Sequence, residues 1–262
     1  MTQGQSLSTL DKQRQIASML DMQMHLVLKT CPRSILRHVD LNAGSGWNDS
    51  FDVPGSPVVF VELADEILGK KWEAWFFERN PELMAQLKKR LGWHPRCHLI
   101  EADNAGFLEV TKRYISRYDV GTLLVDPNGW FYRALNGEGA PVREVITFLK
   151  NHPRMDLLAN LNAQFYIKAR GAERNHPHPP TYKDFYGLRD LQRVLGKQHG
   201  LMSTLSSNGH SRFVRIIYRN IRTNDYRAMG WYHLDSPEGT RVCEELEGPN
   251  GSRPNGQLVF AI

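Results

Sequence analysis

Acidic and amide side chains follow each of four apolar runs in this chain, in every case where the run ends. In chain order they are Asp40 and Asn42, Glu78, Asp103 and Asn104, and Asp126 and Asn128. Their oxygens accept hydrogen bonds from ribose hydroxyls and from the amino group of adenine. A single acid at such a point is more often part of a turn or a helix cap. Four successive occurrences predict one shared site, provided that the runs are parallel strands of one sheet.

A glycine-containing stretch from His38 to Gly46 follows the first run and would shape this site. It begins apolar, carries Asp40 in the middle, and ends in Gly44 and Gly46, one residue apart. Glycine adopts backbone angles that other residues avoid and has no Cβ, so a ligand can approach the main chain there. At the carboxyl end of a parallel strand, this is where open α/β sheets bind nucleotides. The alternative is an ordinary turn after a strand.

The elements that must position these residues alternate between strand and helix about five times along the chain. Strands are expected at residues 34–41, 72–77, 96–100, 121–125 and 155–167, and helices at residues 10–28, 56–68, 80–91, 107–118, 142–150 and 184–199. This alternation predicts an α/β fold with a Rossmann-like, doubly wound and mostly parallel sheet. A strand at residues 213–218 is expected to pair antiparallel at the end of that sheet.

Three parts of the chain are predicted from the same segments. Residues 1–33 form an N-terminal helical segment, residues 34–220 the Rossmann-like domain, and residues 221–262 a basic and aromatic C-terminal extension packed on that domain. Asp11 is the candidate cap of the first helix, and Ser56 is the candidate cap of the second, with Pro57 in its first turn. Residues 47–57 are expected to form a loop because they are rich in Gly, Pro, Asn and Asp.

The composition excludes several classes of protein. With 262 residues and 41% hydrophobic content, the chain can bury a large core. No apolar run is long enough to cross a bilayer, and Met1 to Leu10 does not resemble a signal peptide. The scattered Cys31, Cys97 and Cys243 form no disulfide framework and suit a reducing compartment. A cytoplasmic protein without membrane attachment is expected.

The charge is moderately positive, with a net value of +5 and a pI of about 9.1. This balance suits a polyanionic partner such as nucleic acid. Arg170, Arg174, His176 and His178 in a proline-rich loop are candidates to face phosphates. So are the arginines that lie among aromatic residues near the end of the chain, Arg212, Arg215, Arg219, Arg222 and Arg227. The alternative is a solvated basic face. His176 and His178 have no acid or cysteine at ligand spacing, so no metal site is expected.

Four stretches of the sequence resemble motifs of class I S-adenosylmethionine-dependent methyltransferases. They are Val39-Asp40-Leu41-Asn42-Ala43-Gly44-Ser45-Gly46, Phe77-Glu78-Arg79-Asn80-Pro81, Glu101-Ala102-Asp103 and Val125-Asp126-Pro127-Asn128-Gly129. The chain looks most similar to the proteins called three-Cys-motif partners, which share the glycine loop, a following Gly-Ser-Pro and an Asp-Pro-x-Gly. The resemblance covers roughly residues 37–161, and the C-terminal third is not part of it.

The resemblance implies S-adenosylmethionine as the cofactor. The loop from Gly44 to Gly46 would wrap its methionine part, Glu78 would hold the ribose, and Asp103 with Asn104 would face the adenine. The implied cofactor-binding set is Asp40, Asn42, Ala43, Gly44, Gly46, Glu78, Arg79, Asp103 and Asn104. The spacing from the glycine loop to Glu78 is long for such a fold, so an inserted loop and helix must fit between them.

The run Asp126-Pro127-Asn128-Gly129-Trp130 resembles the Asp/Asn-Pro-Pro-aromatic motif of amino-group methyltransferases. The Asp126 side chain and the Pro127 carbonyl would bind the two N–H groups of an exocyclic amine, and an aromatic ring would stack on a base held outside the nucleic-acid stack. The chain departs from the motif because Asn128 replaces the second proline and Gly129 the aromatic residue. Trp130 follows one position late. Alternatively, Asp126 belongs to cofactor binding or loop structure, and Trp130 to the core.

Asp126, Pro127, Asn128 and Trp130 are therefore the candidate catalytic residues. Together with the resemblance they predict a methyltransferase that acts on nucleic acid, with an adenine amine in DNA favoured over RNA as the acceptor. Two alternatives remain open. The acceptor could be a small molecule or a protein, or the chain could be a binding module that keeps the cofactor site without turnover.

Overall fold

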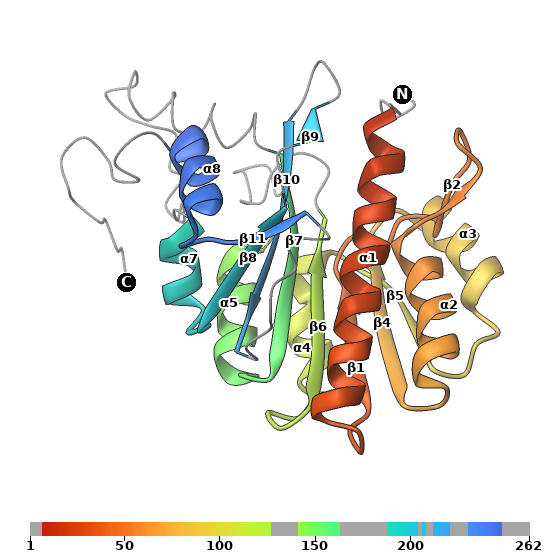
Figure 1. Ribbon diagram of the computed structural model, residues 1–262. Helices are drawn as coiled ribbons and strands as arrows, with labels where there is room; N and C mark the ends of the chain where they lie inside the picture. Colours follow the sequence, from red (N-terminus) through yellow and green to blue (C-terminus); the bar gives the residue numbers. More distant parts are fainter. Residues whose placement is uncertain are drawn as a thin grey trace, which may run out of the picture. The chain divides into compact units, whose positions relative to one another are not determined.

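The computed structural model describes residues 7–126, 141–162, 188–203, 206–207, 212–220 and 230–247 (Figure 1). The chain divides into two compact units. The first consists of Met1–Asp126 with Asn151–Leu158, and the second of Pro127–Lys150 with Ala159–Ile262. The predicted boundaries at residues 33 and 220 stay predictions.

Parallel strands form the centre of the first unit. They are β1 (Leu36–Asp40), β4 (Trp72–Glu78), β5 (Cys97–Glu101) and β6 (Val120–Val125). Their order is β5-β4-β1-β6, and each neighbouring pair is parallel. The chain first builds outward from β1 through β4 to β5, and then returns to place β6 on the other side of β1. This reversal between β1 and β6 is the position at which open α/β sheets bind ligands.

Helices cover both faces of these strands. Helix α2 (Ser56–Leu68) lies on one face, where Phe60 stacks on His38 with ring centroids 3.9 Å apart. Helix α4 (Phe107–Thr111) lies on the other face, where Phe107 meets Phe77 edge to face at 6.4 Å. Because successive strand residues point to opposite faces, neighbouring residues of β4 serve different layers. The predicted doubly wound arrangement is confirmed, with α2 in front of the strands and α4 behind them in Figure 1.

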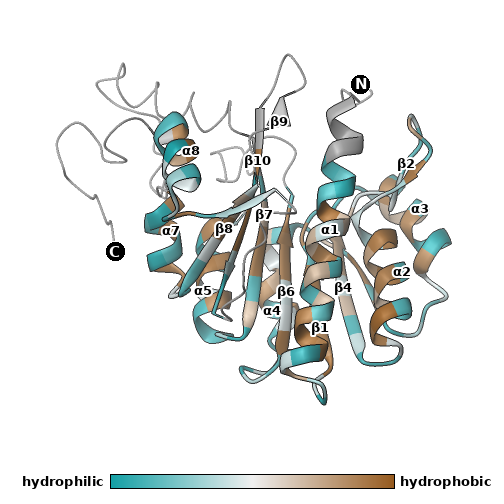
Figure 2. Ribbon diagram, in the orientation of Figure 1, coloured by the Kyte–Doolittle hydropathy of each residue, from teal (hydrophilic) through white to brown (hydrophobic). Residues whose placement is uncertain are grey.

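The burial of these elements explains why the sequence forms them. All six residues of β6 are buried, as expected of a parallel strand covered on both faces. Helix α2 is largely hydrophobic in Figure 2 and buries Val58, Val59, Phe60, Val61 and Ala64. Helix α3 (Pro81–Leu91) begins where Asn80 accepts hydrogen bonds from the Glu82 and Leu83 amides, as its Asn-Pro start predicts.

The predicted N-terminal helix is confirmed as α1 (Leu7–Thr30). Its apolar stripe is buried against the unit, and α1 packs beside α2. Asp11 is not its cap, because the helix begins one turn earlier. A buried hydrogen bond also holds α1 in place: Gln23 Nε2 donates at 2.8 Å to Oδ2 of Asp156, which lies on β7 (Met155–Asn162). Helix α1 is thus an integral layer of the first unit.

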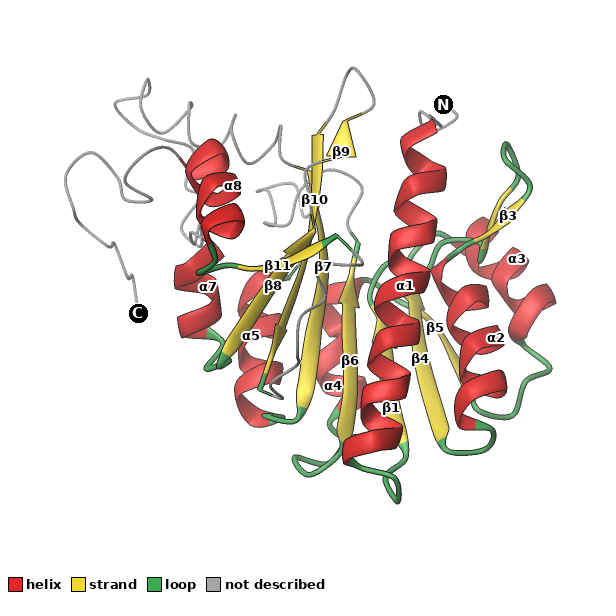
Figure 3. Cartoon of the chain, viewed as in Figure 1, coloured by secondary structure: helices red, strands yellow, loops and turns green. Residues whose placement is uncertain are grey.

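Three further local predictions in the first unit are wrong (Figure 3). Residues 47–57 are not all loop, because β2 (Trp47–Asn48) and β3 (Val53–Pro54) pair as a short hairpin. Ser56 is not the cap of α2, since Gly55 occupies that position and the Ser56 hydroxyl donates to Asp40 instead. The helix expected at residues 107–118 ends at Thr111, and Asp119 closes a turn on the Ser116 amide.

The second unit carries antiparallel strands. Strand β10 (Arg212–Arg219) pairs antiparallel with β8 (His199–Ser203) and with β9 (Ser206–Ser207), and β11 (Trp231–His233) pairs antiparallel with β8. The predicted antiparallel strand at 213–218 is confirmed as β10. Among the described residues, the helices of the second unit are α5 (Val142–Asn151), α7 (Leu188–Val194) and α8 (Pro237–Glu247).

The helix expected at 184–199 is wrong at its end, because Gly196 at φ 66° precedes β8. Taken together, the fold class is α/β and Rossmann-like, with a mostly parallel sheet and antiparallel strands, as predicted. Within the part of the chain that the structure describes, no helix combines the length and hydropathy that a membrane crossing requires.

Candidate functional site

The glycine loop leaves β1 at the point where the strand order reverses. Leu41 N donates to Leu124 O at 3.1 Å, and Ala43 N donates to Phe77 O at 3.0 Å, so both neighbouring strands hold the start of the loop. Gly44 and Gly46 adopt φ angles of 62° and 75°, which L side chains rarely adopt. The backbone conformation therefore favours glycine at both positions, as predicted.

The two glycines differ in what surrounds them. A Cβ atom at Gly46 would lie 2.8 Å from Leu87 Cδ1 and 3.3 Å from Val58 Cγ2, so the loop packs directly onto helices there. A Cβ atom at Gly44 would meet no heavy atom of the described residues within 4 Å. The open side of the loop is thus at Gly44, where a ligand can approach the main chain.

Asp40 is fully buried and holds the loop from within. Its Oδ1 accepts from the Asn42 amide at 2.9 Å, and its Oδ2 accepts from the Ser56 hydroxyl at 2.8 Å. Burial raises the pKa of Asp40, while the hydrogen bonds from Asn42 and Ser56 lower it, the charge of Asp126 raises it and that of Lys12 lowers it. The net result is a pKa of about 7. Asp40 therefore ties the glycine loop to the first turn of α2.

Glu78 at the end of β4 reaches back to the glycine loop. Its Oε2 accepts from Gly44 N at 3.0 Å, and its Oε1 accepts from Asn80 N at 2.7 Å. The inserted hairpin and α2 do not separate the two, so the long spacing in the sequence is no obstacle. A carboxylate has about four acceptor positions, and these two amides leave room for a hydroxyl pair.

Asp103 and Arg79 lie on the rim beyond Glu78. Asp103 Oδ1 accepts from Ala105 N at 2.8 Å and begins a short 3₁₀ turn, Asn104–Gly106. Its Oδ2 lies 4.0 Å from Arg79 Nη1, and the two side chains are 41% and 61% exposed. Both are open to solvent at the carboxyl ends of β4 and β5.

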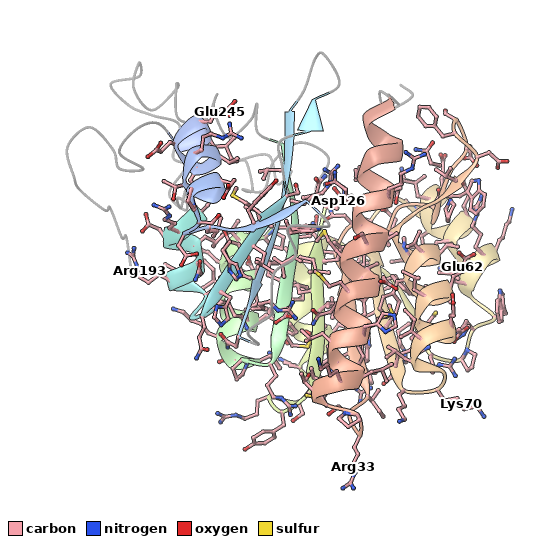
Figure 4. All side chains as sticks on the ribbon, in the orientation of Figure 1. Arg33, Glu62, Lys70, Asp126, Arg193 and Glu245 are labelled. Carbon is pink, nitrogen blue, oxygen red and sulfur yellow. The ribbon has the colours of Figure 1, made fainter. Side chains whose placement is uncertain are left out.

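Asp126 follows β6 directly and is 8% exposed. Its main-chain N–H donates to Asn42 Oδ1 at 3.2 Å, which joins the end of β6 to the glycine loop across the strand reversal. Figure 4 shows Asp126 beside α1 and at the opposite end of the first unit from Arg33. Pro127, Asn128 and Trp130 lie outside the described residues, as do His176 and His178.

Two functional candidates were missed in the sequence. Lys12 of α1 forms an ion pair with Asp126, with Nζ 2.5 Å from Oδ2. Arg90 of α3 donates from Nη1 to the Ser45 carbonyl at 3.3 Å and lies over the Trp47 ring at 5.9 Å. In a single sequence both resemble ordinary basic residues on amphipathic helices, so no local signal identifies them.

The site thus brings the predicted acids together at one edge of the parallel strands. These residues suit the three parts of an adenosyl cofactor. The open main chain at Gly44 could hold the methionine part, the Glu78 carboxylate the ribose, and the exposed Asp103 the base. Among the described residues, no group of three or more His, Cys, Asp or Glu side chains is arranged to hold a metal ion.

Similarity to a solved structure supports the fold, although the sequence comparisons find no match. No family model and no curated protein matches the sequence. Protein LPL1258 from Legionella pneumophila, of the family named DUF519, is similar in structure, with a TM-score of 0.51, 14% identity, and coverage of 90% of this chain and 91% of that chain.

Weaker likenesses include an S-adenosylmethionine-dependent methyltransferase from Agrobacterium tumefaciens (TM-score 0.45, 11% identity, coverage 81% and 62%) and an rRNA methylase from Streptococcus thermophilus (TM-score 0.40, 8% identity, coverage 78% and 93%). At these identities, the likeness to LPL1258 shows the fold alone. The resemblance to three-Cys-motif partner proteins stays a prediction.

Proposed function

We propose that this protein is an S-adenosylmethionine-dependent methyltransferase that modifies nucleic acid, with the exocyclic amine of adenine in DNA as its acceptor. The observation that carries this proposal is the pair of contacts that meet at the glycine loop. Glu78 accepts from Gly44 N, and Asn42 accepts from Asp126 N, so the ends of β1, β4 and β6 form one connected rim. That rim lies at the strand reversal, where Rossmann-like sheets bind nucleotides.

Each part of the rim has a role toward the cofactor. The main chain at Ala43 and Gly44 lies against the methionine part, and Gly46 keeps the loop close to α3. Glu78 accepts hydrogen bonds from the ribose hydroxyls, while Asp103 and Asn104 face the adenine and Arg79 flanks them. Asp40 and Asn42 hold the loop in shape from inside. When bound, the cofactor supplies a methyl group made reactive by a sulfonium centre.

The acceptor side of the site is assigned to the segment that begins at Asp126. The Asp126 carboxylate and the Pro127 carbonyl accept the two N–H groups of the amine and orient its nitrogen toward the methyl group. Trp130 would stack on the base, and Asn128 is included with this pair because it belongs to the same run. The amine nitrogen would form a bond to the methyl carbon while the carbon–sulfur bond breaks, with its electron pair left on sulfur. The nitrogen would then release a proton to solvent.

Nucleic acid is the proposed acceptor because an adenine amine suits an acceptor pair and the chain is positively charged. Phosphate contacts would make binding weaken steeply with salt, whereas binding of a neutral small molecule would not. A base inside a duplex must leave the stack before its amine can reach Asp126.

The test is transfer of a tritiated methyl group to DNA, RNA and protein mixtures by the wild type and by Asp126→Ala, which removes the side-chain acceptor. A matched control is Asp21→Ala, because Asp21 is a 43% exposed acid on α1 paired with His25. We expect labelled DNA with the wild type and control, and a loss of about 100-fold or more with Asp126→Ala. Equal labelling of DNA by all three proteins would remove Asp126 from the mechanism.

Other outcomes select the alternatives. Label in RNA alone would change the acceptor from DNA to RNA, and label in protein alone would remove nucleic acid from the proposal. Tight cofactor binding with no labelled product on any acceptor would favour a binding module without turnover.

A further inference from the structure

Helix α1 contributes a side chain to the rim described above. Lys12 Nζ lies 2.5 Å from Asp126 Oδ2, and the two side chains are only 23% and 9% exposed. Gln23 makes the second polar tie of the helix, to Asp156, at 2.8 Å. Lys12 and Gln23 are about three helical turns apart and so lie on the same face of α1. The face of α1 that packs on the unit therefore carries Lys12 to the end of β6.

The carboxylate of Asp126 and its main chain are held by different partners. The main-chain N–H donates to Asn42 Oδ1 at 3.2 Å, which fixes the backbone at the end of β6. Lys12 holds Oδ2, which fixes the rotation of the side chain. A carboxylate that must accept a hydrogen bond from the substrate in one direction works faster when both its backbone and its side chain are held. Misalignment by about 1 Å costs up to about 100-fold in rate.

The charges around Asp126 explain why a cation is needed there. Asp40, Asp126 and Lys12 interact electrostatically, and Asn42 and Ser56 supply the neutral hydrogen bonds to Asp40. Without Lys12, two carboxylates would face each other at a poorly solvated position, which is unfavourable. One lysine therefore offsets the repulsion between the acid that shapes the loop and the acid proposed to accept the amine.

We propose that Lys12 is a positioning residue of the active site, which holds the Asp126 carboxylate in the orientation that accepts the substrate amine. This role rests on the proposed methyl transfer and extends the site to α1. Lys12 acts through Asp126 and does not itself contact the reacting atoms. A lysine that only anchors the helix would affect cofactor binding as much as it affects turnover.

The experiment compares Lys12→Met, Lys12→Arg and Lys29→Met, the last being an exposed lysine on the same helix. We expect Lys12→Met to lower kcat for methyl transfer about 10- to 100-fold with cofactor Kd close to wild type. The unpaired carboxylates lower its unfolding midpoint, so turnover is measured at a temperature at which both proteins are folded. Lys12→Arg restores most of kcat because it returns the cation, and Lys29→Met behaves as wild type. In Asp126→Ala, adding Lys12→Met causes little further loss, since the two residues act as a unit.

If the wild type transfers methyl groups and Lys12→Met does so equally well or faster, the role of Lys12 is wrong and the proposed function still stands. The role of Lys12 is also wrong if Lys12→Met weakens cofactor binding in proportion to its loss of turnover, because that pattern belongs to an anchor. A wild type that labels no acceptor overturns the proposed function, and the role of Lys12 with it.

Discussion

Glu78 Oε2 accepts a hydrogen bond from Gly44 N at 3.0 Å, although 34 residues separate them in the chain. This contact joins the acid at the end of β4 to the open side of the glycine loop. It also gives Glu78 two tasks, since the same carboxylate receives Asn80 N at 2.7 Å and so holds the start of α3. A ligand at Gly44 therefore meets a carboxylate whose orientation is already set.

Replacing Glu78 tests its assignment to the ribose. Glu78→Gln keeps the size of the side chain but loses the charge and part of the acceptor capacity, so we expect cofactor affinity to fall about 10- to 100-fold, as for other charge-assisted hydrogen bonds. Titration calorimetry with S-adenosylmethionine measures the effect. Glu82→Gln, an exposed acid in the first turn of α3, is the control. Unchanged affinity in Glu78→Gln would remove Glu78 from the cofactor site.

The two loop glycines are expected to differ in their effect on stability. Alanine at either position is forced into the left-handed region, which costs about 1–2 kcal/mol. Gly46→Ala adds the contact with Leu87 at 2.8 Å, and overpacking of this kind costs about 1–3 kcal/mol more. Urea unfolding should therefore rank the wild type above Gly44→Ala and Gly44→Ala above Gly46→Ala. The reverse order for the two variants would mean that the loop packs differently.

The buried Asp40 makes a specific contribution to the pH dependence of stability. Its pKa is raised from 3.8 to about 7, so the folded state binds the proton more tightly than the unfolded state. This contribution is fully present below pH 3.8, falls as pH rises toward 7, and is constant above that. The difference in unfolding free energy between wild type and Asp40→Asn should follow this curve, with a total change on the order of 4 kcal/mol.

His38 acts in the opposite direction and hides part of this effect in the wild type. Burial lowers its pKa from 6.5 to about 3, so its contribution to stability is lost as pH falls through that window. Between about pH 4 and 6.5 the two contributions offset each other, and Asp40→Asn should expose the rising limb of His38. If the difference between Asp40→Asn and wild type were flat across this range, Asp40 would not titrate as a buried acid.

Arg90 should affect cofactor binding without contacting the cofactor. It connects α3 to the Ser45 carbonyl and to the Trp47 ring, and so holds the far side of the glycine loop. We expect Arg90→Gln to weaken S-adenosylmethionine binding about 3- to 10-fold, as loss of one charge-assisted hydrogen bond would. The exposed neighbour Lys89→Gln provides the control for charge. A Kd for Arg90→Gln equal to that of Lys89→Gln would show that the loop does not need this support.

Most of the parallel half of the fold could be predicted because its signals are local. The run 120–125 has only one polar residue, Thr122, and is buried throughout since both of its faces are covered. Asn80-Pro81 begins a helix by capping and by the fixed φ of proline. The acids could be placed at one rim because they follow parallel strands. Their side-chain contacts could not be read, but the topology makes them meet.

The remaining features depend on contacts between distant residues. The pairing of Lys12 with Asp126 joins two elements far apart in the chain, and nothing near Lys12 distinguishes it from a solvated lysine. Ser56 precedes a proline and therefore resembles a cap, yet the buried Asp40 attracts its hydroxyl. The hairpin of β2 and β3 has strands of two residues each, too short to show a periodic pattern.

We propose that the rim around Gly44, Glu78 and Asp126 directs a methyl group to an adenine amine. The most direct measurement is nucleoside mass spectrometry of a DNA oligonucleotide after incubation with the protein and deuterium-labelled S-adenosylmethionine. We expect N6-methyladenine with the label from the wild type and from Asp21→Ala, and about 100-fold less from Asp126→Ala. Label on another atom of the nucleic acid, or equal N6-methyladenine from all three proteins, would contradict it.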